Sequence, residues 1–122
     1  MFDDTKPIYR QIAERIETDV LTGTLGPDDK VMSTNEYSAF YRINPATVGK
    51  AFQQLVDRGV LYKQRGIGMF VDPGAKDLLR NEHRRHFVDN MVVPLVAEAM
   101  AIGLSLDEVI EAIQEIAKEE VS

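Results

Sequence analysis

The sequence contains no cysteine. Disulfide bonds, zinc sites built from thiolates and cysteine nucleophiles are therefore all excluded. No apolar run approaches the roughly 18 residues that a membrane-spanning helix needs, and charged side chains interrupt residues 1–20, where a signal peptide would have its apolar core. A cytoplasmic protein without a membrane partner is expected. Its 122 residues, 44% apolar and 28% charged, suit one ordinary domain or one small domain with an appendage.

The sequence also lacks the motifs of common enzymes. It has no glycine-rich phosphate loop, and no Ser-His-Asp or paired-carboxylate constellation falls where a pocket is expected. The five methionines fit gap-filling in a core or interface better than a cofactor role. An enzyme is therefore the weakest hypothesis, and no cofactor is expected.

Charge is unevenly distributed along the chain. The net charge is -6, yet residues 40–72 carry five basic side chains against two acidic ones. Binding to nucleic acid depends on where charge lies rather than on its sum. This basic segment therefore makes DNA binding compatible with the negative net charge.

Three helices are expected in the first half. Isoleucines and a valine at steps of four predict a helix over about 7–22. Ser33 and Glu36 form a capping box that starts a short second helix reaching about Tyr41. Asn44 as N-cap and Pro45 after it start the third helix, whose N-terminus would offer free N–H groups to phosphate. Two short helices so closely joined are typical of a helix-turn-helix.

After the third helix, the pattern of apolar residues changes from helical to strand-like. The β-prone residues 60–63 and 69–71 flank "RGIG", which predicts a hairpin. The breaker at 72–74 divides the chain into domains 1–72 and 75–122. A long helix over about 75–102 is expected to kink at Pro94, and a capping box from Ser105 to Glu108 starts the last helix. The predicted fold is mainly α with a small β-hairpin: an N-terminal winged helix-turn-helix and a C-terminal helical dimerisation tail.

Two stretches with this order of elements resemble the DNA-binding domain of the GntR family of bacterial transcription regulators. They are "PIYRQIAERI" and "STNEYSAFYRINPATVGKAFQQLVDRGVLYKQRGIGMFV". "INPATV" and the two-helix tail resemble its YtrA-like subgroup. The resemblance implies a homodimeric repressor of a palindromic operator in double-stranded DNA, often of a transporter operon, released by a small-molecule effector. Family arginines are replaced here by Asn35, Pro45 and Gly49, so the family's base preference does not carry over. Arg42 stands where the family favours glycine, which implies either a positive φ or a different turn.

The candidate DNA-binding residues lie on three segments. The third helix turns small polar side chains and one cation outward, as entry into a major groove requires. A basic hairpin tip fits a wing on the DNA backbone or in a narrow minor groove. The alternatives are that Asn44 and Thr47 only cap a helix, that the hairpin is merely solvated, and that Tyr9 packs on the hairpin. The candidates are Asn35, Asn44, Ala46, Thr47, Lys50, Lys63, Gln64, Arg65, Gly66, Tyr9 and Arg10.

The C-terminal tail carries an apolar face that two helices cannot bury alone. A second copy of the chain would cover it and place two reading heads on two half-sites. The alternative is an intramolecular clamp onto the winged domain. The candidate dimerisation residues are Phe87, Met91, Leu95, Val96, Ala99, Val109, Ile113 and Ile116.

The stretch "HRRH" lies on the same tail. His83, His86 and Asp89 are spaced by about one helical turn, which could hold a metal weakly. A polar face near the domain junction is the preferred interpretation, so no metal site is expected. If an effector binds there, Arg84, Arg85, His86 and Asp89 are its candidate contacts, in the crevice expected around residues 72–91. The competing function for the whole chain is a winged-helix protein-interaction module without specific DNA binding.

Overall fold

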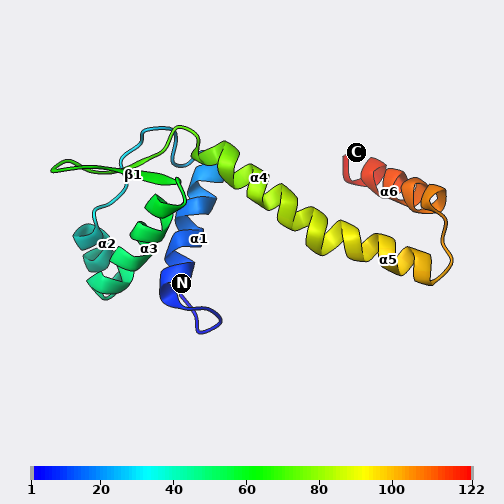
Figure 1. Ribbon diagram of the computed structural model, residues 1–122, viewed down its shortest axis with the longest axis horizontal. Helices are drawn as coiled ribbons and strands as arrows, with labels where there is room; N and C mark the ends of the chain where they lie inside the picture. Colours follow the sequence, from blue (N-terminus) through cyan, green and yellow to red (C-terminus); the bar gives the residue numbers. More distant parts are fainter. Residues whose placement is uncertain (1, 122) are drawn as a thin grey trace. The chain divides into compact units, whose positions relative to one another are not determined.

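The computed structural model describes residues 2–121, which separate into two compact units with the division after Asn81. The first unit begins with three helices, as predicted: α1 (Ile8–Leu21), α2 (Thr34–Tyr41) and α3 (Pro45–Asp57). A hairpin of β1 (Leu61–Gln64) and β2 (Gly68–Val71) follows. Figure 1 shows this hairpin extending from the three-helix cluster.

The start of each helix follows from local sequence. Ser33 Oγ accepts the N–H of Glu36, and the Glu36 carboxylate accepts the N–H of Ser33, so the expected capping box is present. Asn44 Oδ1 accepts the N–H of Ala46 at 2.8 Å, and Pro45 occupies the first helical position. Three residues therefore separate the end of α2 from the start of α3.

The core of the first unit lies where α1, α3 and the hairpin meet. Packing of α1 on α3 buries the apolar stripe of each helix. The strands are antiparallel, with Leu61 opposite Val71 and Gln64 opposite Gly68. The largest fully buried side chains are Phe52, Ile12, Leu55, Leu61, Leu79, Val48, Val60 and Val71.

Residues 28–31 make a contact with the hairpin that the sequence did not predict. The Val31 N–H donates to the Met69 carbonyl at 3.0 Å, and the Val71 N–H donates to the Asp29 carbonyl at 2.9 Å. Lys30 thereby forms an isolated antiparallel bridge with Phe70. The free edge of β2 is thus covered by a segment some 40 residues earlier in the chain.

Helix α4 (Ala75–Phe87) begins inside the first unit. Ala75 and Leu79 are fully buried in its core. The compact unit therefore extends to Asn81, past the breaker at 72–74 where the boundary was expected, because the first turns of α4 supply two core side chains.

The second unit continues with a π turn η1 (Val88–Val92), α5 (Val93–Ala101) and α6 (Leu106–Val121). The π turn closes with the Val93 N–H bonded to the Val88 carbonyl, immediately before Pro94, which cannot donate to Asn90. The expected interruption of the long helix thus takes the form of a widened turn. Ser105 and Glu108 form the predicted second capping box at the start of α6.

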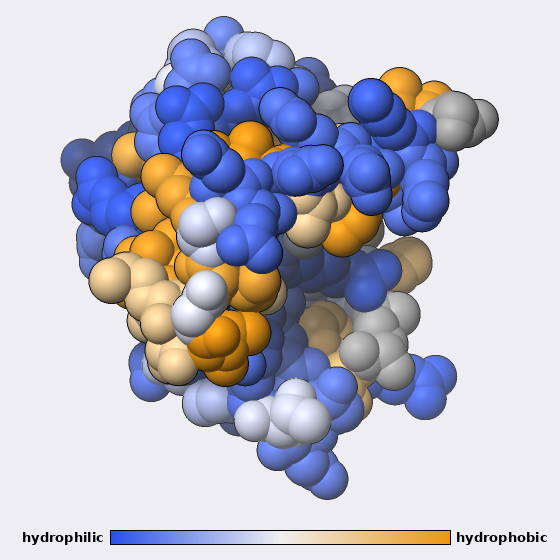
Figure 2. Space-filling view, turned by 90° about the vertical axis from the view of Figure 1, so that its right-hand side faces the viewer, coloured by the Kyte–Doolittle hydropathy of each residue, from blue (hydrophilic) through white to orange (hydrophobic). Residues whose placement is uncertain are grey.

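Helices α5 and α6 pack together and bury Ala99. Over residues 82–121, Ala99 is the one buried side chain, and most apolar side chains of this unit are exposed. Figure 2 shows hydrophobic residues gathered among hydrophilic ones on the face that it presents. None of the helices in the described part of the chain combines the length and apolar character needed to cross a membrane.

Candidate nucleic-acid interface

The outer face of α3 is small and polar. Val48, Ala51, Phe52 and Leu55 are buried, which turns the remaining positions of the first two turns outward. Asn44, Ala46 and Lys50 are exposed, whereas Thr47 and Gly49 are half-buried. This face has no bulky side chain that would keep the helix out of a major groove about 12 Å wide.

The first-turn N–H groups of α3 are already bonded. Ala46 donates to Asn44 Oδ1, and both Thr47 and Val48 donate to the Asn44 carbonyl, at 3.0 and 3.2 Å. The expectation of free N–H groups for phosphate is therefore wrong, because the Asn44 cap and Pro45 satisfy or remove them. Contacts from this turn must come from side chains, and the Asn44 amide nitrogen remains available beside its capping oxygen.

Two candidate residues from different helices form one cluster. The Lys50 ammonium lies 4.0 Å from the centre of the Tyr9 ring, a cation–π contact between α3 and α1. Tyr9 therefore packs beside the exposed face of α3. Arg10, its neighbour on α1, is exposed and has no contact with this pair among the described interactions.

The turn between α2 and α3 has the left-handed geometry that was one of the two alternatives. Arg42 has φ 55° and ψ 50°, and its N–H donates to the Ser38 carbonyl, as does that of Ile43. The Ser38 hydroxyl donates back to the Ile43 carbonyl. These bonds hold a non-glycine residue in the αL region and leave the Arg42 side chain exposed.

The hairpin tip is a tight turn. The Ile67 N–H donates to the Gln64 carbonyl at 2.9 Å, and Gly66 takes φ 80°, a conformation that favours glycine. Arg65 occupies the turn beside Gly66. All four predicted wing residues are exposed: Lys63, Gln64, Arg65 and Gly66.

Lys30 adds a cation to the wing that the sequence did not predict. A Cβ at Gly68, whose φ is 147°, would lie 2.9 Å from the Lys30 Cε, so the lysine stem lies directly against the second strand. At the base of the hairpin, the Tyr62 hydroxyl donates to Asp28 at 2.7 Å, and this bond raises the Tyr62 pKa. No local pattern could have indicated Lys30, because its place depends on pairing with a distant strand.

The remaining candidates lie on separate surfaces. Asn35 is exposed in the first turn of α2. In the second unit, Ala99 is buried between α5 and α6 and Val109 is half-buried, whereas the other predicted dimerisation residues are exposed. The predicted effector residues Arg84, Arg85, His86 and Asp89 are all exposed, and an effector role for them stays a prediction.

The sequence and the structure of this chain are similar to those of known proteins. Residues 8–71 match the family described as bacterial regulatory proteins, gntR family. The chain is 32% identical to the HTH-type transcriptional repressor YtrA of Bacillus subtilis (strain 168), over 90% of this chain and 84% of that protein. A GntR family transcriptional regulator from Listeria monocytogenes superposes with a TM-score of 0.72 at 28% identity, over 93% and 98% of the two chains.

A third relative has been solved with DNA. The structure of AraR(DBD) in complex with operator ORX1 covers 58% of this chain and 92% of its own, with a TM-score of 0.54 and 32% identity. The arrangement of helices and hairpin described above is thus similar to that of a domain seen on its operator.

Proposed function

The chain belongs to the gntR family of bacterial regulatory proteins, and from this premise we propose that it is a cytoplasmic, homodimeric repressor that binds a palindromic operator. As a member of this family it is a transcription regulator with a winged helix-turn-helix DNA-binding domain, and not an enzyme. The proposal adds the oligomeric state, the symmetry of the operator and the residues that contact it.

The observation that carries the proposal is the small, polar outer face of α3 with the Lys50–Tyr9 contact beside it. The outer face of α3 presents Asn44, Ala46 and Thr47 beside the Lys50–Tyr9 pair, and the hairpin presents Arg65 at its tip. A helix face of this kind reads base edges in the major groove, whereas a basic tip contacts the backbone or the minor groove. These are the two contacts that a winged helix makes with one half-site.

The second unit supports the homodimer. Phe87, Met91 and Ile116 are 59%, 62% and 60% exposed, although soluble monomers seldom expose contiguous apolar surface of this extent. The same surface of a second chain, related by a two-fold axis, would bury this apolar helical surface. Two winged domains related by that axis would bind two half-sites of inverted sequence.

Binding isotherms test the DNA-reading part of the proposal. The purified protein is titrated against its own upstream DNA and against scrambled DNA of the same composition, at two salt concentrations. Tight binding to the upstream DNA alone, weakened by Lys50→Ala and by Arg65→Ala but not by Lys118→Ala on α6, is expected. Equal and weak binding to both DNAs would instead favour a protein-interaction module.

Sedimentation equilibrium tests the homodimer separately. Leu95→Glu and Ile113→Glu place charge on the apolar face of α5 and α6 and are expected to give monomers. Ile67→Glu at the hairpin tip is the matched control, because Ile67 is 60% exposed on the first unit and should leave the dimer intact. A wild-type protein that sediments as a monomer at micromolar concentration would refute the homodimer.

A further inference from the structure

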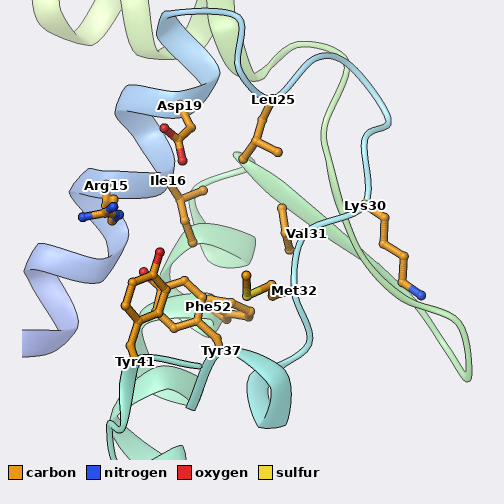
Figure 3. A pocket seen from close by; sticks show the side chains of 10 residues that line it. All are labelled: Arg15, Ile16, Asp19, Leu25, Lys30, Val31, Met32, Tyr37, Tyr41 and Phe52. Carbon is orange, nitrogen blue, oxygen red and sulfur yellow. The ribbon is translucent and has the colours of Figure 1, made fainter. Parts of the chain in front are cut away.

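The winged domain contains a pocket that the DNA-reading surface does not use. Its volume is about 220 Å³, and it lies between α1, residues 25–32 and α2, with Phe52 of α3 at its base. Figure 3 shows the apolar side chains of Ile16, Leu25 and Val31 facing its interior. Every residue that lines it belongs to the first unit.

A buried tyrosine hydroxyl faces this pocket. Tyr37 is 6% exposed, and among the described residues no group hydrogen-bonds to its hydroxyl oxygen. Tyr41 and Phe52 hold the ring in place, with centroids 4.5 and 5.7 Å away. Burial raises the Tyr37 pKa to about 12, so the group is a neutral donor at physiological pH. Buried hydroxyls are nearly always hydrogen-bonded in proteins, so this hydroxyl is available to a polar atom that enters the pocket.

The polar end of the pocket carries one cation and one anion. Arg15 and Asp19 line it from α1, four residues apart on one face of the helix. The Arg15 guanidinium lies 5.4 Å from the Tyr41 ring centre, and no ion pair joins Arg15 to Asp19 within residues 2–121. Figure 3 shows both tyrosine hydroxyls on the side of α1, whereas Lys30, which also lines the pocket, directs its ammonium group away from them.

We propose that this pocket binds a small apolar zwitterion, of the size and chemistry of a hydrophobic amino acid. The ligand carboxylate accepts hydrogen bonds from Arg15 and from the Tyr37 hydroxyl, and its ammonium group donates to Asp19. The apolar side chain of the ligand lies against Phe52 and Val31. A simple acid would leave Asp19 facing an anion, and a hydrocarbon would leave the Tyr37 hydroxyl unbonded.

The size of the pocket fits this class of ligand. About 220 Å³ is below the range of roughly 300–1,000 Å³ that holds drug-sized molecules. Both helices of the helix-turn-helix contribute to the pocket lining, with Tyr37 from α2 and Phe52 from α3. A ligand that prefers one arrangement of these helices would shift the DNA affinity of the domain. The binding site itself depends on neither DNA reading nor dimerisation, so its test needs neither.

Methionine methyl NMR of the full chain tests the site directly. Met32 lines the pocket, whereas Met91 and Met100 lie in the second unit and serve as internal references. L-Leucine and L-phenylalanine are expected to shift the Met32 signal saturably and to leave both references unchanged. Phenylacetate and phenethylamine, each with one of the two charges, are expected to bind at least about tenfold more weakly, as the loss of one charged contact implies. An unmoved Met32 signal, or equal binding of phenylacetate, would overturn the proposal.

Two variants assign the contacts. Tyr37→Phe removes only the hydroxyl and is expected to weaken L-leucine binding about tenfold, the effect of one hydrogen bond. Asp19→Asn should abolish the preference for L-phenylalanine over phenylacetate, whereas Asp107→Asn on α6 should retain it. A Met69 signal that matches that of the wild type shows that the winged domain of each variant is folded, because Met69 packs against its core. Wild-type affinity in Tyr37→Phe, or unchanged selectivity in Asp19→Asn, would refute the assigned contacts.

Discussion

The Lys50 ammonium group lies 4.0 Å from the centre of the Tyr9 ring and joins α3 to α1. The two residues are far apart in sequence, yet both were candidates for DNA contact. A cation–π contact at an exposed site is worth about 0.5–1 kcal/mol. It restricts the lysine side chain, and this reduces the conformational entropy that the side chain would lose on binding a phosphate or a base.

Lys50→Ala and Tyr9→Leu are expected to weaken DNA binding in different ways. Loss of Lys50 removes a charge, so the slope of log K against log salt should decrease in magnitude by about one if the contact is to phosphate. Tyr9→Leu should keep that slope and lower the affinity severalfold, because the charge remains but is no longer held. Tyr9→Phe retains the ring and is the control. Wild-type affinity in Tyr9→Leu, measured by fluorescence anisotropy at several salt concentrations, would contradict a positioning role.

Gly49→Ala should raise the stability of α3 and weaken DNA binding at the same time. A Cβ at Gly49 would meet no atom within 4 Å, so alanine should stabilise the helix by about 0.5–1 kcal/mol. The added methyl lies on the outer face, where it would obstruct close approach to base edges. A higher melting temperature with severalfold weaker operator binding is expected. Gly26→Ala, outside α3, should leave affinity unchanged, and the same affinity in both variants would argue against groove entry at Gly49.

Arg42→Gly should stabilise the winged domain. Arg42 has φ 55°, and a non-glycine residue in this region carries a conformational penalty of about 1 kcal/mol that glycine avoids. Urea denaturation should show a gain of that size for glycine and little gain for Arg42→Ala, which retains a Cβ. Equal gains in the two variants would assign the effect to loss of the arginine side chain instead.

Glu17→Gln should destabilise the protein more than Glu14→Gln on the same helix. The Glu17 side chain is 11% exposed and accepts a hydrogen bond from Arg58, at the C-terminal cap of α3. Weakening this charged, largely buried contact is expected to cost about 1.5–3 kcal/mol. Glu14 pairs with Lys6 at 2.8 Å, but both side chains are about half exposed, so less than about 1 kcal/mol is expected there. Similar losses in the two variants would show that the buried pair contributes no more than the exposed pair.

Tyr37 should make stability decline at high pH. Its folded-state pKa of about 12 exceeds the ordinary value of 10.0, so the unfolded chain releases the proton first. The contribution is complete below pH 10 and is lost as pH rises from 10 toward 12, by about 2–3 kcal/mol in all. Tyr37→Phe should lack this part of the decline and should be at least as stable at pH 7, because it removes an unbonded hydroxyl. Identical pH profiles for variant and wild type would contradict the assignment.

Local patterns in the sequence determined most of the secondary structure. Both capping boxes, the Asn44 cap and the hairpin around Gly66 were predicted correctly, because each depends on a few neighbouring residues whose hydrogen bonds form within one turn. The buried face of α3 was predicted for a similar reason, since helical period alone decides which side chains share a face. At Arg42 the sequence left two alternatives, and the structure has the positive φ, with local hydrogen bonds among Ser38, Arg42 and Ile43.

Contacts between distant segments were decided only by the tertiary structure. Lys30 reaches the wing because residues 28–31 pair with β2, and Lys50 meets Tyr9 because α1 packs on α3. The same packing encloses Tyr37 without a hydrogen-bond partner and draws Leu79 into the winged core. No pattern of neighbouring residues specifies these contacts, because each depends on how the apolar faces of remote elements fit together, and that fit is a property of the whole folded domain.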